Sequence, residues 1–220
     1  MVEPETDSLV KAETRQRLLE AAGEVFAEVG FAKATVRDIC RRAGANVAAV
    51  NYHFRDKEGL YVEVVRFAQQ YAMTAAPPAA LPMESATPEE QLRLFIRTFL
   101  FGAIGKGRLA WHGKMMAREM SEPTGMLDRI VTEVIRPRAT MLEGILRRLL
   151  GPAATQWRIE ACARSVVSQC IFYHLCRPVI DRLHPAQKYE PEDVEQLADH
   201  IATFSIAALR GIASLSQEQP

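Results

Sequence analysis

Residues 33–57 read KATVRDICRRAGANVAAVNYHFRDK, and this stretch decides the fold. Thr35 and Asp38 have the spacing of a capping box, which predicts that a helix begins directly after Thr35. Gly44 can adopt the positive φ of a sharp turn, and Asn46 is a favoured N-cap for a second short helix. Two short helices that join at a glycine are typical of a helix-turn-helix motif.

Charge is distributed unevenly along the chain, and the motif is basic. The whole chain contains 27 Lys and Arg and 27 Asp and Glu, so its formal net charge is zero. Residues 33–57 contain six cations and two carboxylates, which leaves a local charge of +4. A basic motif in a neutral protein indicates DNA binding that is local and sensitive to salt. On charge alone, the alternative is an ordinary solvated pair of helices.

Residues 11–60 resemble the N-terminal domain of the TetR family of bacterial transcriptional repressors. The matching stretches are Arg17–Ala22, Phe26–Phe31, Thr35–Ile39, Ala43–Gly44, Asn51–Phe54 and Lys57–Leu60. The resemblance implies a DNA-reading head, a larger effector-binding body, and a homodimer that reads a palindromic operator. More loosely, the chain resembles the CecR-like subgroup of this family, whose members are linked to efflux and antibiotic-response operons.

The second helix of the motif departs from the pattern of many family members, because its groove-facing side chains are small or carry an amide. Such groups can contact thymine methyls and adenine edges in the major groove, and they are the candidate base readers. With the N-cap included, these are Asn46, Val47, Ala48, Ala49 and Asn51. Candidates for phosphate contacts, which position the protein without reading sequence, are Arg37, Tyr52, His53 and Lys57. Val50 is expected in the core.

The remaining sequence predicts an all-α fold. Apolar residues recur at helical spacing beyond residue 88, and we find no segment with the alternation of a strand. The stretch AAPPAALP at 75–82 cannot stay helical. We therefore predict a helix-turn-helix DNA-binding domain at 11–74, an Ala/Pro-rich linker at 75–87, and an effector-binding and dimerisation domain of bundled helices at 88–215.

Capping residues, glycines and prolines set the expected helix bounds outside the motif. We expect helices at about 11–29, 57–74, 88–105, 109–120, 124–149 (broken or kinked near Pro137), 155–183 and 191–214. Residues 1–10 are expected to fray. The last helix carries apolar and small side chains suited to close pairing with a second copy: Leu197, Ile201, Ala202, Phe204, Ser205, Ala208, Gly211 and Ile212.

Seven residues of the predicted body have the chemistry of an adaptable small-molecule pocket. Methionine and aromatic side chains form apolar walls, and a Tyr or His can orient a ligand. These candidates are Phe95, Phe99, Trp111, Met115, Met116, Tyr173 and His174. Plain core packing is the alternative for each of them.

The four cysteines are expected to be reduced thiols used as small apolar groups. Cys170, His174 and Cys176 raise the question of a zinc site, but we find no fourth ligand and expect neither metal nor cofactor. Cys170 with His174 is the basis of two alternative functions, a Cys/His enzyme and a thiol redox sensor. With no long apolar run and no signal pattern, a soluble cytoplasmic protein is expected.

Overall fold

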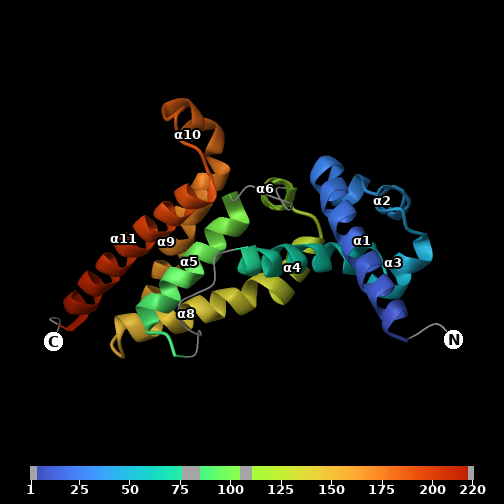
Figure 1. Ribbon diagram of the computed structural model, residues 1–220. Coiled ribbons are helices and arrows are strands. Elements are labelled where there is room, and N and C mark those ends of the chain that lie inside the picture. The colour runs from blue at the N-terminus through green and yellow to red at the C-terminus, as the bar shows by residue number, and fades with distance from the viewer. Residues whose placement is uncertain (1–3, 76–84, 105–110, 218–220) are drawn as a thin grey trace. The chain divides into compact units, whose positions relative to one another are not determined.

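The computed structural model describes residues 4–75, 85–104 and 111–217, and all of its regular elements are helices (Figure 1). The predicted all-α fold is confirmed. In chain order the elements are α1 Pro4–Lys33, α2 Val36–Ala43, α3 Val47–Phe54, α4 Lys57–Ala75, α5 Pro88–Ile104, α6 Trp111–Ser121, α7 Met126–Ile130, a π-helical segment η1 Val131–Ile135, α8 Arg136–Leu150, α9 Gln156–Leu175, α10 Arg177–Leu183 and α11 Pro191–Gln217. None of the described helices is long and apolar enough to cross a membrane.

The helices form two compact units. The first, here called the head unit, comprises residues 1–70 and 108–134, and the second, the body unit, comprises 71–107 and 135–220. α6 and α7 thus belong to the same unit as the helix-turn-helix motif, although they lie within the predicted domain at 88–215. The predicted domain limits remain predictions, and most of the predicted linker at 75–87 lies outside the described residues.

Local capping forms the motif as predicted. The Thr35 hydroxyl accepts a hydrogen bond from the Asp38 N–H (3.1 Å), and α2 begins at the next residue after Thr35. Gly44 has φ 59° and ψ 40°, the left-handed geometry that closes α2. The Asn46 side-chain oxygen accepts from the Ala49 N–H (2.9 Å) and starts α3. Both hydrogen bonds connect residues three apart in sequence, and the Gly44 turn depends on that residue alone, so the local sequence was sufficient to predict all three features.

The first helix is longer than expected. It begins at Pro4 instead of near residue 11, so the prediction that residues 4–10 fray is wrong. Proline suits the first helical turn because its missing N–H needs no partner there, and acidic residues near a helix N-terminus interact favourably with its dipole. The expected break at Gly30 is confirmed, since this residue has φ 79° and ψ 166°.

α6 packs against α1 within the head unit through an unusually close approach. A Cβ added at Gly23 would lie 2.4 Å from the Trp111 indole ring, so only glycine at this position leaves room for the ring. Trp111 is accordingly buried. Ion pairs also connect α4, α7 and η1 within the head unit. Arg129 on α7 pairs with Glu58 on α4 (3.6 Å) and with Glu133 on η1 (3.0 Å).

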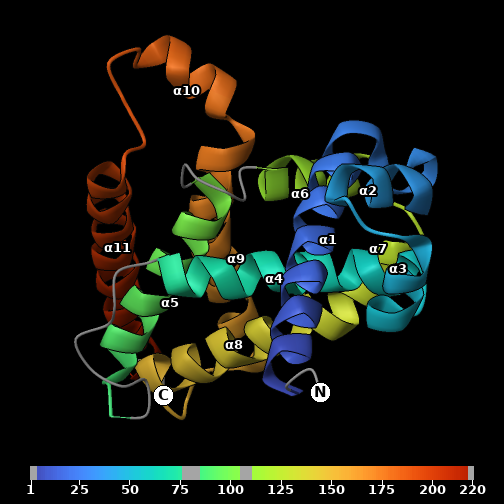
Figure 2. The same cartoon turned by 45° about the vertical axis from the view of Figure 1, so that its right-hand side comes forward.

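The body unit is a bundle of α5, α8, α9 and α11, and α10 lies beyond the end of α9 (Figures 1 and 2). Its core contains apolar side chains from all four bundle helices, among them Leu92, Ile96, Leu146, Val166 and Ile201. α5 and α11 are also joined by ion pairs, for example Arg97 with Glu195 (2.6 Å). The predicted helical bundle is thus present, although its helix bounds differ.

Two predicted long helices are interrupted. The expected helix 155–183 ends at Leu175, and α10 starts separately at Arg177 with Pro178 in its first turn. A proline inside one continuous helix would remove a hydrogen bond and clash with an earlier carbonyl. Proline is therefore better accommodated in the first turn of a new helix. Near Pro137, where a break or kink was expected, the backbone stays helical but changes type, because the π-helical segment η1 ends at Ile135 and α8 begins at the following residue.

Candidate nucleic-acid interface

α3 presents its predicted reading face to solvent. Ala48 and Asn51 are exposed, Val47 is 43% exposed, and Ala49 is partly exposed. Val50 is fully buried, as expected for the core residue of this helix. The predicted reading face from Val47 to Asn51 therefore exposes methyl groups and one amide.

Asn46 is the exception among the predicted readers. Its side-chain oxygen is occupied as the N-cap of α3, through the bond to the Ala49 N–H. The remaining amide group can only donate in this arrangement. Asn46 consequently has less capacity for base recognition than Asn51, whose exposed amide retains both functions.

The four arginines of the motif divide into a paired set and an unpaired set. Arg41 pairs with Asp38 (2.6 Å), and Arg42 makes two 2.8 Å bonds to Glu28, which lowers the pKa of the Glu28 carboxyl through its hydrogen bond. Arg37 and Arg55 are exposed and make no hydrogen bond or ion pair to any described residue. Arg37 thus fits its predicted contact with phosphate.

Lys57 does not fit that role in this geometry. Its ammonium donates to the Phe31 carbonyl (2.9 Å) and the Ala34 carbonyl (3.1 Å), and it lies 4.3 Å from the centroid of the Phe31 ring. The side chain is partly buried and connects α4 to the end of α1. A lysine with these partners stabilises the packing of the head unit. Its contacts therefore favour a structural role over the predicted phosphate contact.

Tyr52 and His53 come directly after Asn51, near the C-terminal end of α3. Tyr52 is 71% exposed, consistent with a surface role instead of a core one. The pKa of His53 is lowered, first by burial and then by the positive charges of Arg15 and Lys11. His53 is therefore more readily neutral than an ordinary histidine, and its ring N–H can still donate to a phosphate.

The same effect reveals two residues of α1 that the sequence interpretation missed. Lys11 and Arg15 are near enough to His53 to influence its charge, so the N-terminal half of α1 adds positive potential beside the end of α3. Arg15 also lies over the Phe54 ring (5.5 Å) and pairs with Glu63 (2.6 Å). Their i, i+4 spacing places both on one helix face, which was the available sequence signal.

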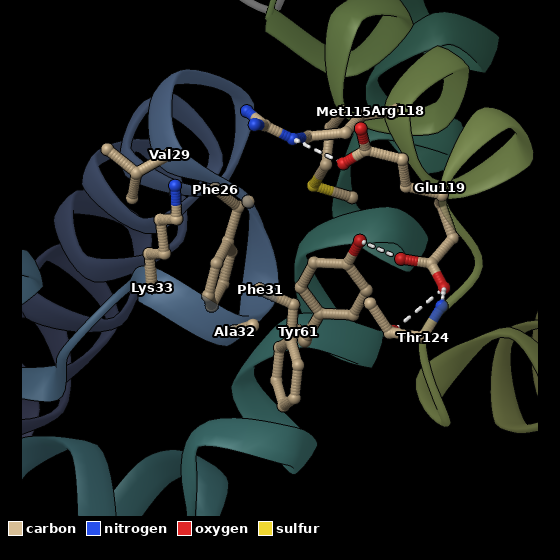
Figure 3. Close-up of a pocket in the computed structure, with 12 residues that line it drawn as sticks. Phe26, Val29, Phe31, Ala32, Lys33, Tyr61, Met115, Arg118, Glu119 and Thr124 are labelled. Atoms are coloured by element: carbon tan, nitrogen blue, oxygen red, sulfur yellow. Dashed lines mark hydrogen bonds and ion pairs between the residues drawn. The ribbon is translucent and has the colours of Figure 1, made fainter.

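A buried hydrogen-bond network connects α4 to α6 within the head unit (Figure 3). The Tyr61 hydroxyl donates to Glu119 on α6 (2.9 Å), and the other carboxylate oxygen accepts from the Thr124 N–H (2.9 Å) and hydroxyl (2.8 Å). Glu119 is 2% exposed, and burial raises the pKa of Tyr61. The network lines a cavity of about 120 Å³, which Phe26 and Met115 also line.

The seven predicted pocket residues are divided between the two units. Trp111, Met115 and Met116 lie on α6 in the head unit, where Met115 is 1% exposed. The other four lie in the body unit: Phe95, Phe99, Tyr173 and His174. Phe95 and Phe99 form a ring pair with centroids 6.2 Å apart. Neither unit alone contains the predicted set as a single pocket.

Three of the four thiols lack the properties of nucleophiles. Cys170 is fully buried, and burial raises the pKa of its thiol to about 12. The pKa values of Cys40 and Cys162 are raised by burial as well. A thiolate is the reactive species, so these environments favour neither a Cys/His enzyme nor a redox sensor. Within the described ranges, no group of three His, Cys, Asp or Glu residues is arranged to hold a metal.

Comparisons with known proteins match the chain to helix-turn-helix transcriptional regulators. Residues 18–64 match the family described as bacterial regulatory proteins, tetR family, and residues 88–209 match the C-terminal domain of the HTH-type transcriptional dual regulator CecR. The chain is 23% identical to CecR of Shigella flexneri over 93% of the chain and 95% of that protein. It is 25% identical to the transcriptional repressor NicS of Pseudomonas putida, covering 90% and 92%.

A solved structure shows a similar fold. The transcriptional regulator FadR from Bacillus subtilis, determined in complex with stearoyl-CoA, superposes with a TM-score of 0.61 at 19% identity. The comparison covers 87% of this chain and 97% of that one. At this identity the likeness concerns the arrangement of helices and not the ligand.

Proposed function

The chain belongs to the TetR family of bacterial regulatory proteins, and from this membership we propose that it is a dimeric repressor released from DNA by a small-molecule effector. Its relatives are transcriptional regulators, so regulation of transcription is its general function. Beyond this we propose that the protein represses transcription, that its operator is palindromic, that a small-molecule effector releases it, and that it acts in the cytoplasm.

The observation that carries the DNA-binding proposal is the exposed surface of α3. Val47, Ala48 and Asn51 project from a helix whose opposite side is buried through Val50, and two unpaired arginines, Arg37 and Arg55, flank it among the described residues. Methyl and amide groups recognise A·T-rich edges in the major groove, whereas guanidinium groups bind phosphates. This combination favours an operator in which A·T pairs contact α3.

Exposed apolar side chains on two body helices support the dimer. On α9, Trp157 is 65% and Phe172 is 51% exposed, and on α11, Phe204 is 61% and Leu215 is 66% exposed. Phe204, Ala208 and Gly211 share one exposed face of α11. Exposed large apolar side chains of this kind are typical of interfaces, and a second copy of the chain would bury them.

Only some of the α11 residues predicted to pair with a second copy of the chain are exposed enough to do so. Ile201, Ala202 and Ser205 are buried in the core of their own chain, while Leu197 and Ile212 pack partly against it. The expected pairing role of these five residues is thus replaced by a role within the body unit. The dimer proposal depends instead on the exposed face and on the matching face of α9.

Effector release requires that the ligand bind the non-DNA-binding state more tightly. A coupling of roughly 1–3 kcal/mol changes DNA affinity by about 5–150-fold. FadR is named in its structure as a complex with stearoyl-CoA, so a protein with this fold can hold a small molecule. We place the effector of this protein in the body unit, which has the apolar core and aromatic side chains such a site needs.

The proposal is tested by fluorescence anisotropy with DNA from upstream of the protein's own gene. We expect sequence-selective binding that weakens steeply as salt rises. Asn51→Ala should relax the discrimination between operator variants by about 1–3 kcal/mol at one position, while Arg37→Ala should weaken binding to all sequences alike. Lys188→Ala, which removes an exposed charge from the body unit, is the matched control.

Two results would contradict the proposal. The first is DNA binding by the wild-type protein that does not distinguish the upstream sequence from random DNA of equal length. The second is equal loss of affinity in Arg37→Ala and Lys188→Ala, because net charge instead of the α3 surface would then control binding.

A further inference from the structure

Arg138 occupies an unusual environment in the body unit. It lies in the first turn of α8, and its guanidinium carbon is 5.8 Å from the ring centroids of both Phe95 and Phe99 on α5. The two rings are inclined at 37° to one another. A planar cation is thus held against two aromatic rings, one of which, Phe99, remains partly exposed.

The guanidinium of Arg138 has no hydrogen bond or ion pair to any residue that the structure describes. Several other arginines of the body unit are paired with carboxylates. They include Arg93 with Asp199, Arg97 with Glu195, Arg177 with Asp181 and Arg210 with Glu89. Burial also lowers the pKa of Arg138, which means that its charge has lost part of its hydration.

Arg138 is partly buried, and a partly desolvated cation without an anionic partner is unfavourable for a folded protein. Ring faces offset part of this loss, but they do not satisfy the guanidinium N–H groups, which form a planar fork. Carboxylate and phosphate oxygens match that fork in a two-bond arrangement. Apolar ring surface next to the fork suits a ligand whose charged group is attached to a hydrocarbon.

We propose that Arg138, held by Phe95 and Phe99, recognises the anionic group of the effector, and that the effector is an organic carboxylate or phosphate ester with an apolar body. The inference rests on the proposed function, since it names the chemical class of the ligand that releases the protein from DNA. Phe95 and Phe99 keep their predicted place in the pocket, and Arg138 is a ligand-binding residue that sequence reasoning did not select.

Matched probes test the proposal. Octanoate and octyl phosphate carry the two anionic groups on the same chain, and octan-1-ol is their neutral counterpart. Each is titrated into the wild-type complex with operator DNA, and release is followed by anisotropy. We expect at least one anion to release DNA at about tenfold lower concentration than octan-1-ol. The comparison of the two anions identifies the preferred group.

Variants assign the effect to this side chain. Arg138→Met keeps an unbranched side chain against the rings but removes the charge, and it should abolish the preference for anions over octan-1-ol. Arg136→Met, at an exposed position of the same turn, should retain the preference. Without probe, Arg138→Met should melt at a temperature no lower than the wild type, because it relieves a desolvated charge.

The outcomes separate this inference from the proposed function. If operator binding is intact but no anion outperforms octan-1-ol, or if Arg138→Met retains the preference, the inference is wrong and the repressor proposal survives. A marked fall in melting temperature for Arg138→Met would instead assign Arg138 a structural role. Failure of wild-type operator binding before any probe is added contradicts the proposed function itself.

Discussion

Arg55 shows how a single residue can combine strain with function. It ends α3 with φ 74° and ψ −51°, and the other positive φ angles in the described residues belong to glycines. A side chain in this region costs on the order of 1–3 kcal/mol. Arg55 is also exposed beside α3, where its charge can contact a phosphate.

We predict that Arg55→Gly raises the melting temperature and weakens DNA binding. Glycine tolerates the positive φ, although its greater freedom in the unfolded chain offsets part of the gain, so the net stabilisation should be about 1 kcal/mol or less. Loss of one phosphate contact should reduce the slope of log affinity against log salt by about one. Arg55→Lys keeps both strain and charge and serves as the control. Unchanged salt dependence in Arg55→Gly would contradict the assignment.

His53 makes the stability of the head depend on pH. Its pKa is lowered in the folded protein, while the unfolded chain retains the ordinary value of about 6.5. The unfolded state therefore binds more protons as pH falls. The contribution of His53 to stability is complete above about pH 6.5 and is lost as pH falls through the lower folded pKa.

The corresponding prediction compares thermal unfolding of the wild type and His53→Gln. Between about pH 7.5 and about pH 5.5, the melting temperature of the wild type should fall more than that of His53→Gln. His184→Gln, at an exposed position in the body unit, should behave like the wild type. Parallel pH profiles for the wild type and His53→Gln would show that His53 is not responsible.

Individual residues of the site differ in how far they were predictable. Thr35 and Asn46 were identified correctly because a cap and its partner are three residues apart. The contacts of Lys57 could not be predicted, since its carbonyl partners lie 26 and 23 residues earlier in the chain, where spacing carries no information. Arg138 was missed for the same reason, because its ring partners are on another helix.

Among the helices, α4 depends on α6 for its position in the head unit. Tyr61 contributes one of three hydrogen bonds to the buried carboxylate of Glu119. Its ring also packs edge-on against Phe26, with centroids 4.7 Å apart. Tyr61→Phe keeps the ring contact but removes the hydrogen bond, so it isolates the polar contribution.

We expect Tyr61→Phe to lower the free energy of unfolding by about 1–3 kcal/mol, because a buried carboxylate loses a donor. Urea unfolding followed by circular dichroism measures the change. Glu122→Gln, whose side chain is 79% exposed at the end of the same helix region, should change stability little. Equal stability of Tyr61→Phe and the wild type would show that water replaces the hydroxyl without loss.

Helix bounds were predictable where a single glycine or proline at the bound determines it. Gly30 interrupts α1, and Pro137 lies at the change from η1 to α8. Pro178 was overlooked, because an apolar pattern continues through it and does not reveal whether a proline lies inside a helix or starts a new one. The extension of α1 to Pro4 was missed since composition alone suggested a frayed end.

At the scale of the whole molecule, the exposed face of α11 predicts that DNA binding depends on dimerisation. Phe204→Glu places a charge on this face and should convert a dimer into a monomer in light scattering. Operator affinity should fall by at least about tenfold, because one head buries too little surface for specific binding. Gln187→Glu adds the same charge at an exposed loop position and should leave the dimer intact. A monomeric wild type would contradict this prediction.

The close fit of Trp111 over Gly23 bears on how this protein can be re-engineered. A chimeric regulator could be made by exchanging the N-terminal segment that carries the DNA-binding motif for that of a relative. Here the head unit also includes residues 108–134, so a graft limited to residues 1–70 would divide a folding unit. A donor segment with any side chain at position 23 would meet the indole ring. A functional exchange must therefore transplant α6 and α7 together with α1–α4, or carry glycine at position 23.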